Sequence, residues 1–521
     1  MVNGGDWCKR PVAVAQLLIL DESCIYLIMQ GRKQYQEKLF TSFQLSDRVP
    51  ADNLYRKITE LIDFQFLYQK TEQYYGNEGQ ASIDPIVFFK LMLVGYLENL
   101  CSDRRIIQMS SMRMDVLFFL GYDIDEPLPW HSTLSRTRQL YGETVFEELF
   151  RQVLKQCIDK GMVSGRRQAV DSVLIKANAS MESLLEKEIL DDVTTYSKEL
   201  NEDEAEVISM KPGGEKGKGR NNKTHYSPAD SDARISTKPG KPFNLNYLGQ
   251  LSVDTESYII THAQAFHADK KDSQCLAEVV NNTIKNLREN NVEMEQVLAD
   301  GNYSSSEALE SLESIALTGY IPNFGPYKST RAGFTYEAEH DRYVCAGGKY
   351  LLFKGLKNHH GINKQYRSSS KDCKACLIKT NCVGAANNKT ITESLSKPLF
   401  DKMEKRVKSR YGFKMRRLRQ STVEPVIGTL VNFLGLKRIN AKGLSNATKC
   451  VTMAAIAYNL KKLVKFYRNH PAKPVKLALK GANNLSDLAK LSFRRKIEFV
   501  LPKLTCNQLA ESATYRSTKL Y

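Results

Sequence analysis

The sequence predicts a multi-domain chain with an α-helical N-terminal part, a mixed α/β core and a β-rich insertion. Three observations carry this prediction. The chain has 521 residues, too many for one ordinary hydrophobic core. From residue 40, apolar residues recur three and four positions apart, as they do in amphipathic helices. From residue 166 the pattern becomes strand, strand, strand, helix, strand, which indicates an α/β core.

The N-terminal part is predicted to be a set of short helices. Residues 82–100, "SIDPIVFFKLMLVGYLENL", are apolar on all sides and predict a buried helix, which 102–122 follow after a short break. Residues 128–142, "LPWHSTLSRTRQLYG", predict a turn and then a helix that carries Arg136 and Arg138. Tight turns and a basic last helix suit a helix-turn-helix-like DNA-binding domain, and a plain helical bundle is an equal alternative.

The α/β core is predicted from four segments. Residues 166–180, "RRQAVDSVLIKANAS", indicate a strand with Asp171 in its middle. Residues 246–268 indicate two strands with a turn at Asp-Thr-Glu, and 272–290 a helix. A further strand ends at Asp300, where Gly and Asn in "ADGNYSS" predict a turn.

The composition of the second half of the chain changes twice. Residues 305–400 are rich in Gly, Tyr, Lys and short strand-like runs and predict a β-rich insertion. Residues 402–419 contain nine Lys or Arg and one Glu in a helical pattern. The predicted divisions are 1–39, a leader; 40–160, a helical DNA-binding domain; 161–304, the first part of the core; 305–400, the insertion; 401–466, the basic helical second part of the core; and 467–521, a basic tail.

The charge of the chain indicates which kind of partner it is expected to bind. A net charge of +17 and a pI near 9.2 favour a polyanion, either nucleic acid or an anionic membrane surface. No apolar run reaches ~18 residues, so we expect no membrane span. Eleven scattered cysteines, an odd count, suit reduced thiols in a cytosolic protein.

Three acids occur where packing does not require them: Asp171 inside a strand, Asp300 at a strand end and Glu424 in "STVEPVIGTL". Each alone has an ordinary explanation, as a hydrogen-bond acceptor, a turn cap and a helix-start residue respectively. If strands and a helix bring them together, their repulsion needs a divalent cation, and oxygen ligands suit Mg²⁺ or Mn²⁺. Such ions activate water or a 3′-hydroxyl for phosphoryl transfer, and nearby basic helices would hold the DNA backbone.

A cysteine set in the predicted insertion suggests a second metal. "CKAC" is a Cys-x-x-Cys pair, and the full set is Cys345, Cys373, Cys376 and Cys382. Four thiolates suit a structural Zn²⁺ ion, although the long first spacing makes this weaker than two Cys-x-x-Cys pairs. Reduced structural cysteines are the equal alternative.

Several segments in order resemble the DDE transposases of bacterial insertion sequences, and among them the eleven-eighty-two group. The resemblance runs from about Phe40 to Phe466. It is carried by "EGQASIDPIVFFKLMLVGYLENL", "GYDIDEPLPWHSTLSRTRQLYG", "AVDSVLIKANASMESL", "SPADSDARISTKPGK", "LNYLGQLSVD", "LADGNYSS", "RQSTVEPVIGTLVNFLGLKRIN" and "AAIAYNLKKLVKF". It implies an RNase H-like catalytic core whose metal-binding Asp-Asp-Glu triad is Asp171, Asp300 and Glu424.

The resemblance also implies an activity: metal-dependent cleavage at the ends of the element and strand transfer into target DNA. The expected partners are double-stranded DNA, as terminal inverted repeats and as target, and a second copy in a synaptic homodimer. The expected location is the bacterial cytoplasm, on the nucleoid. The residues expected to bind DNA are Arg136, Arg138, Arg416, Arg417, Arg419, Lys437 and Arg438.

One departure supports the first of two alternatives, and the second alternative shares the same acidic site. Relatives often have a basic residue two helical turns after the glutamate, where this chain has Val431; Lys437 and Arg438 are one to two turns further on. The alternatives are an inactive DNA-binding relic of a transposase and a metal-dependent nuclease that does not join strands. An intact acidic triad argues against the relic.

Overall fold

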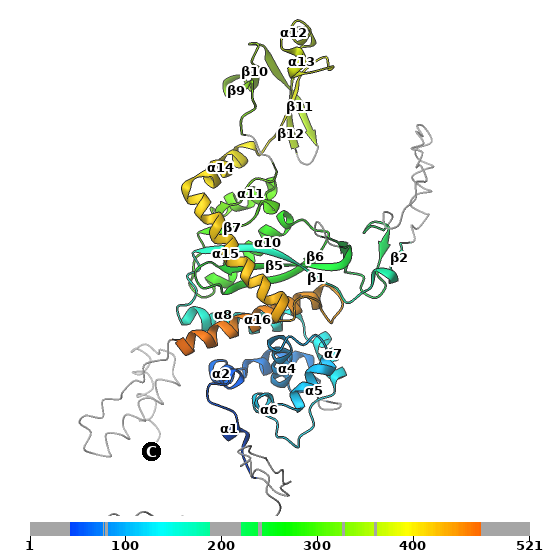
Figure 1. Cartoon of the computed structure of the whole chain (residues 1–521), viewed down its shortest axis with the longest axis vertical. Helices are drawn as coiled ribbons and strands as arrows, with labels where there is room; N and C mark the ends of the chain where they lie inside the picture. Colours follow the sequence, from blue (N-terminus) through cyan, green and yellow to red (C-terminus); the bar gives the residue numbers. More distant parts are fainter. Residues whose placement is uncertain are drawn as a thin grey trace, which may run out of the picture.

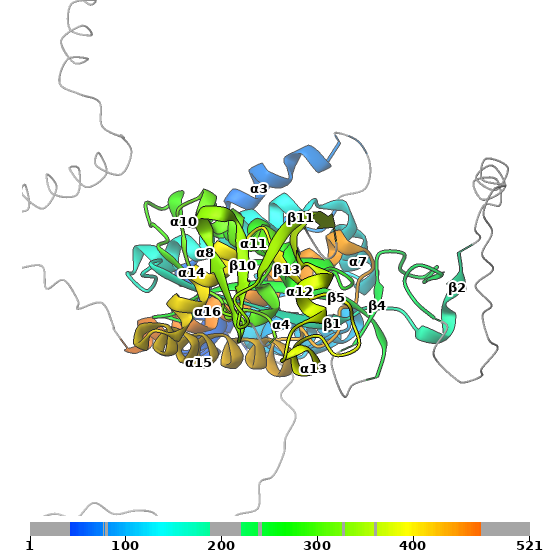
Figure 2. The same ribbon diagram turned by 90° about the horizontal axis from the view of Figure 1, so that it is seen from above.

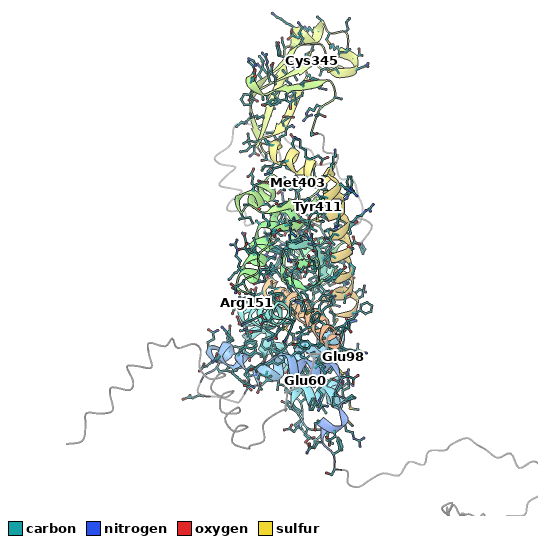
Figure 3. All side chains as sticks on the ribbon, turned by 90° about the vertical axis from the view of Figure 1, so that its left-hand side faces the viewer. Glu60, Glu98, Arg151, Cys345, Met403 and Tyr411 are labelled. Atoms are coloured by element: carbon teal, nitrogen blue, oxygen red, sulfur yellow. The ribbon has the colours of Figure 1, made fainter. Side chains whose placement is uncertain are left out.

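The computed structural model describes residues 42–76, 78, 82–187, 220–237, 242–325, 329–358 and 362–469. The predicted leader and all but the first residues of the predicted tail lie outside them. The molecule is elongated, with short helices at one end, a sheet in the middle and a small β-rich unit at the other end (Figure 1). Side chains labelled along the long axis follow this order, from Glu60 and Glu98 through Tyr411 to Cys345 (Figure 3). In the described part of the chain, no helix has the length and apolar character needed to cross a membrane.

The N-terminal end is helical, as predicted. In α4 (Pro85–Leu97), Asp84 accepts hydrogen bonds from the backbone N–H groups of Ile86 and Val87, and Pro85 fits the first helical position. All but two of the residues of α4 are buried, which confirms the expectation from an apolar pattern on all sides. The other helices are α1 (Leu45–Arg48), α2 (Leu54–Leu61), α3 (Phe66–Thr71), η1 (Glu72–Tyr74), α5 (Asp103–Ser111), α6 (Met114–Leu120), α7 (His131–Leu140) and α8 (Glu143–Asp159).

The central sheet is mixed. β1 (Arg167–Lys176) pairs antiparallel with β5 (Asn244–Asp254) and parallel with β7 (Gln296–Leu298). β5 also pairs antiparallel with β4 (Arg234–Ser236) and β6 (Ile260–His267), and β7 pairs parallel with β8 (Thr318–Tyr320). A separate two-stranded ribbon joins β2 (Leu185–Glu186) to β3 (His225–Tyr226), next to η2 (Met181–Ser183). The structure confirms the predicted strands around Asp171, the 246–268 pair and the strand before Asp300.

Helices cover both faces of the sheet (Figure 2). α10 (Asp272–Arg288), η3 (Gly301–Tyr303) and α11 (Ser306–Ser314) share one apolar cluster with Val170 of β1 and Leu248 of β5. α15 (Arg410–Phe433) and α16 (Leu444–Asn469) share another cluster with Ala169 and Val173 of β1. Because successive strand residues point to opposite faces, Asp171 lies on the α15 face and Ser172 on the α10 face.

The β-rich insertion begins later than predicted. β8 and α11 fall inside the predicted range 305–400, but they belong to the central sheet and its covering layer. β8 has only three residues, too few to show an alternating pattern in the sequence. The insertion itself is an antiparallel sheet of β9 (Phe334–Glu337), β10 (Arg342–Cys345), β11 (Tyr350–Asn358), β12 (Ile362–Ser368) and β13 (Thr390–Ser394), with η4 (Ala338–His340), α12 (Ser370–Lys374) and α13 (Lys379–Cys382).

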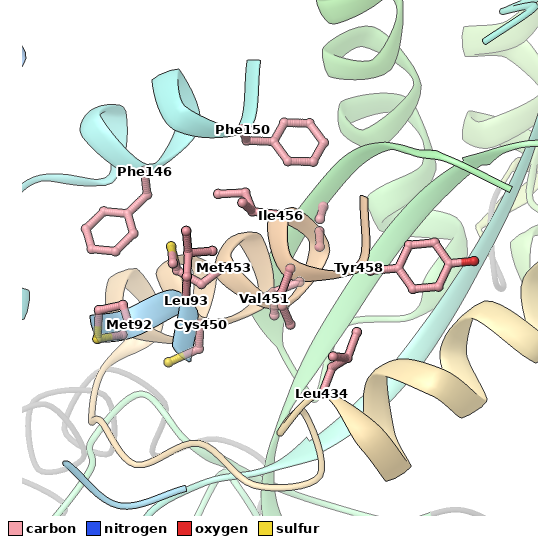
Figure 4. Close-up of a cluster of buried hydrophobic side chains, with 14 of the residues drawn as sticks. Met92, Leu93, Phe146, Phe150, Leu434, Cys450, Val451, Met453, Ile456 and Tyr458 are labelled. Carbon is pink, nitrogen blue, oxygen red and sulfur yellow. The ribbon is translucent and has the colours of Figure 1, made fainter. Parts of the chain in front are cut away.

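The N-terminal helices and the sheet share one hydrophobic core, contrary to the expectation of a separate N-terminal domain. The cause is α16, in which every residue from Ala447 to Leu460 is buried. One side of α16 contacts α4 and α8, and another contacts β6. Figure 4 shows this junction, with side chains of Met92, Leu93, Phe146, Phe150, Cys450, Met453 and Ile456.

α14 (Lys397–Lys408) leads into α15 through a turn that depends on Gly412. A Cβ atom there would lie 2.3 Å from the carbonyl oxygen of Arg406 and 2.5 Å from that of Val407. We expect Gly412→Ala to lower the free energy of unfolding by about 2 kcal/mol, because the end of α14 and the start of α15 must move apart to make room for the added Cβ atom. A Cβ atom added at Gly428, in the same helix, would meet no atom of the described residues within 4 Å, so Gly428→Ala should be neutral or stabilising by up to about 1 kcal/mol. Urea unfolding of both variants checks this pair, and equal effects would contradict it.

Candidate active site

Two of the three predicted acids lie at adjacent positions of neighbouring parallel strands. Asp171 is in β1, and Asp300 follows the last residues of β7. Ala169 pairs with Leu298, so the same register two residues further on places Asp171 opposite Asp300. Asp300 also caps η3, because its carboxylate accepts a hydrogen bond from the Asn302 backbone N–H at 2.9 Å. The predicted turn cap is therefore present, and it coexists with the approach to Asp171.

A single guanidinium joins the two aspartates. The Nη2 atom of Arg419, in α15, lies 2.8 Å from Oδ2 of Asp171 and 3.5 Å from Oδ2 of Asp300. The Arg419 side chain is 11% exposed and the Asp171 side chain 15% exposed, so the contact is largely shielded from solvent. Nε of Arg419 is buried without a hydrogen-bond partner among the described residues. The arginine was predicted to bind DNA phosphate, but here its charge is directed at the acids.

A cleft of about 600 Å³ opens beside the pair. Its walls include Lys270, Lys271, Asp272, Ser304, Ser305 and the exposed ring of Phe324, as well as Asp171 and Asp300. Behind the cleft lies the fully buried Tyr303. Burial, followed by the charges of Asp272, Asp171 and Asp300, raises the pKa of Tyr303 well above its ordinary value. The Tyr303 hydroxyl therefore stays protonated, and it donates its hydrogen bond to Oε1 of Gln250.

Glu424 does not face the pair in this structure. It lies five residues after Arg419, which turns its side chain about 140° around α15. Its neighbours Val423 and Val426 are buried, whereas Glu424 itself is exposed. Pro425 follows within the helix and lacks the N–H that an α-helix interior normally uses.

The carboxylates of the candidate site provide some, but not all, of the ligands that a divalent cation requires. Two carboxylates that already converge on one cationic nitrogen have the charge and oxygen ligands that Mg²⁺ or Mn²⁺ requires. Among the described residues, no group of three or more His, Cys, Asp or Glu side chains is arranged to hold a metal ion. The triad with Glu424 is thus not assembled, and the same is true of the four cysteines.

The four cysteines nevertheless surround one cavity. Cys345, Cys373, Cys376 and Cys382 all line a space of about 360 Å³ in the insertion, and all are free thiols. A Cβ atom added at Gly347 would lie 3.8 Å from Sγ of Cys345 and 3.9 Å from Sγ of Cys376. A side chain at Gly347 would therefore contact both sulfur atoms.

The other basic residues predicted to bind DNA divide into two groups. Arg138 is 2% exposed, and its Nη2 lies 2.6 Å from Oδ1 of Asp103, so it joins α7 to α5 inside the protein. This contact corrects the expectation that Arg138 faces DNA, since the burial of a charged side chain needs such a partner. The remaining residues are exposed: Arg136, Arg416, Arg417, Lys437 and Arg438.

Two family models match this chain, one over its N-terminal helices and one over its C-terminal part. A family model described as "Transposase domain (DUF772)" matches residues 43–140, the N-terminal helices. A second, described as "Transposase DDE domain", matches residues 344–464, which include most of the insertion, α14, α15 and most of α16. The chain belongs to the DDE transposases. This confirms the predicted family and its function as a DNA transposase, and the DDE domain implies a divalent-metal cofactor; the narrower eleven-eighty-two group stays a prediction.

Solved structures similar to the transposase are remote. One is a piggyBac transposase synaptic complex with hairpin DNA, at 9% identity and a TM-score of 0.28, covering 87% of this chain and 85% of that one. Another is the Mos1 transposase paired-end complex with the left transposon end, at 10% identity and a TM-score of 0.15, covering 49% and 64% respectively. TM-scores this low do not establish a shared fold. No curated protein matches the transposase.

Two features of the candidate site were not predicted from the sequence. The contact of Arg419 with both acids joins segments more than a hundred residues apart, and no local pattern reports it. The sequence did contain an indication of Asp272, because this residue is an acid at the start of a helix that follows a strand. In the sequence that signal is indistinguishable from an ordinary helix-start residue.

Proposed function

We propose that this transposase cuts DNA at the ends of its element and joins the freed ends to target DNA, with Mg²⁺ or Mn²⁺ held by Asp171 and Asp300. The observation that carries the proposal is the convergence of these two carboxylates on one cationic group beside an open cleft. The bound metal would supply an activated water or 3′-hydroxyl and stabilise the leaving oxygen. The order of the central strands, β6-β5-β1-β7-β8, supports an RNase H-like core.

Glu424 is proposed as the third carboxylate when metal and DNA are bound. α15 packs directly on β1, so Glu424 is carried by the helix that already reaches the acids through Arg419. Pro425 removes one backbone hydrogen bond next to Glu424, which makes a local change of helix geometry less costly there. Further support for Glu424 comes from the resemblance to DDE transposases, in which the matching position is the glutamate of the Asp-Asp-Glu triad.

The DNA-binding proposal rests on Arg136 in α7 and on Arg416, Arg417, Lys437 and Arg438 in and after α15, all of them exposed. We expect the double variant Arg416→Ala/Arg417→Ala to reduce the slope of log K against log salt by about 2, since each phosphate contact contributes about 0.9. The Arg416→Lys/Arg417→Lys variant keeps the charge and serves as the control. A slope equal to that of the wild type in the alanine variant would show that these arginines do not contact phosphate.

Strand joining is the experiment that tests the function. The full chain is incubated with Mg²⁺, a labelled duplex that carries the element's own end, and a target plasmid. Nicked ends followed by label joined to the plasmid are expected. Nicking without joining would favour the nuclease alternative, and binding without nicking would favour the inactive relic. Chemical crosslinking of the DNA-bound protein tests the proposed synaptic homodimer in the same samples.

A structural zinc ion is proposed for the insertion, because four free thiols line one cavity and thiolates suit tetrahedral Zn²⁺. We expect about one zinc per chain by elemental analysis in the wild type and a nearly complete loss in Cys376→Ser. Cys101→Ser, an exposed cysteine outside the insertion, should keep the metal. Wild-type protein without zinc would leave the four residues as reduced structural cysteines.

A further inference from the structure

A chain of buried polar groups lies behind Asp300, on the α10 face of the sheet. The Tyr303 hydroxyl donates to Oε1 of Gln250 at 2.5 Å, and Nε2 of Gln250 donates to Oδ1 of Asp272 at 2.9 Å. Tyr303 and Gln250 are fully buried, whereas Asp272 is partly exposed and lines the cleft. Polar groups at this depth need partners, so the three residues fix one another's positions.

The three residues come from the three segments that surround the acids. Gln250 is in β5, where it pairs with Ser172, the neighbour of Asp171. Tyr303 ends η3, the short turn that Asp300 caps. Asp272 is the first residue of α10. The chain of hydrogen bonds therefore ties the Asp300 turn to the strand next to Asp171 and to the start of α10.

Asp300 needs such support. β7 has only three residues, and Asp300 lies beyond its last ladder pair with a side chain that is 32% exposed. Tyr303 is the first fully buried side chain after Asp300. Loss of its hydroxyl contact would remove the hydrogen bond that joins the turn to β5, and the buried Tyr303 ring, the Arg419 contact and the Ser304–Asn323 hydrogen bond would be left to hold the turn.

We infer that Asp272 is a positioning residue that acts through Gln250 and Tyr303 to hold Asp300 in place for metal binding. This inference rests on the proposed metal site at Asp171 and Asp300. Groups that orient metal ligands from behind usually affect metal affinity or activity 10–100-fold when they are removed. The hydrogen-bond acceptor of Asp272 is what the inference requires, and its negative charge is not.

The test measures Mn²⁺ binding to the full-length protein by calorimetry, together with nicking and DNA-end binding. Tyr303→Phe and Asp272→Ala are expected to weaken Mn²⁺ binding by about tenfold and to slow nicking at a fixed low Mn²⁺ concentration by a similar factor. Asp272→Asn should remain within about twofold of the wild type, because its amide oxygen still accepts from Gln250. DNA-end binding should be unchanged in all three variants.

Tyr247→Phe is the matched control. Tyr247 is also a fully buried tyrosine of the core, but its hydroxyl donates to Asp230 at 2.6 Å, outside the cleft. It should therefore leave Mn²⁺ affinity unchanged even if it lowers stability. If Tyr303→Phe fails to fold, Asp272→Ala against Asp272→Asn decides the question.

Three results would overturn the inference. The first is Mn²⁺ affinity within twofold of the wild type in Asp272→Ala or in folded Tyr303→Phe. The second is an equal loss in Asp272→Asn and Asp272→Ala, which would show that Asp272 acts through its charge. The third is a wild-type protein that binds no Mn²⁺, which would remove the proposed metal site and the inference with it.

Discussion

Asp300→Asn is expected to lower the rate of Mg²⁺-dependent nicking by about 10³-fold or more, because it removes a metal-ligand charge at the reacting centre. The fold should survive. The asparagine carbonyl can still accept the Asn302 N–H that Asp300 accepts at 2.9 Å, and asparagine is a good capping residue. The measurement is single-turnover nicking of a labelled element end. Asp171→Asn should give a loss of the same order.

The control for this prediction is Asp269→Asn. Asp269 is exposed and lies near the start of α10. Its Oδ2 atom lies 3.5 Å from Nε of Arg234, and the residue is not part of the acid pair. Its substitution should change nicking by less than about twofold. Nicking by Asp300→Asn at the wild-type rate would mean that the metal site lies elsewhere. Glu424→Gln, assayed alongside, tests the third proposed carboxylate separately.

Arg419→Ala is expected to destabilise the metal-free protein by about 3 kcal/mol, since removal of the arginine leaves the shielded carboxylate of Asp171 and the partly exposed carboxylate of Asp300 facing each other without a counter-charge. That corresponds to a fall of several degrees in Tm. Mg²⁺ should then raise the Tm of the variant more than that of the wild type, because a cation entering the wild-type site must displace the arginine. Thermal unfolding with and without Mg²⁺ measures both effects.

Arg416→Ala is the matched control for Arg419→Ala, because Arg416 is an exposed arginine of the same helix. We expect its Tm to lie within about 1 °C of the wild type, with an ordinary response to Mg²⁺. If Arg419→Ala unfolds at the wild-type temperature without metal, the guanidinium does not bridge the two aspartates in solution.

The sequence predicted the elements around the acids well. Asp171 lies within a regular strand, the 246–268 segment forms a hairpin, and Asp300 follows a short strand, because periodicity and turn residues report these local structures. Adjacency of β1 and β7 then brings the two aspartates together. The family resemblance rested partly on these segments; the family models, which match residues 43–140 and 344–464, confirm the family from other parts of the chain.

Partners distant in sequence were not predictable. Arg138 and Arg419 looked alike in their basic helices, yet one is paired with Asp103 and the other with Asp171 and Asp300. A local pattern reports that a helix is basic but not which of its side chains a distant acid neutralises. The sequence did not indicate that α16 would be buried between the N-terminal helices and the sheet and so join two predicted domains. β8 was too short to show any period.

The most direct test of the central claim is the position of a bound metal. Crystals of the protein soaked in Mn²⁺ should show an anomalous scattering peak at about 2 Å from carboxylate oxygens of both Asp171 and Asp300, with Arg419 moved away from them. Whether Glu424 has turned toward the peak can be read from the same map. A map in which Arg419 still bridges the aspartates and Mn²⁺ binds elsewhere, or nowhere, would contradict the metal site proposed for this transposase.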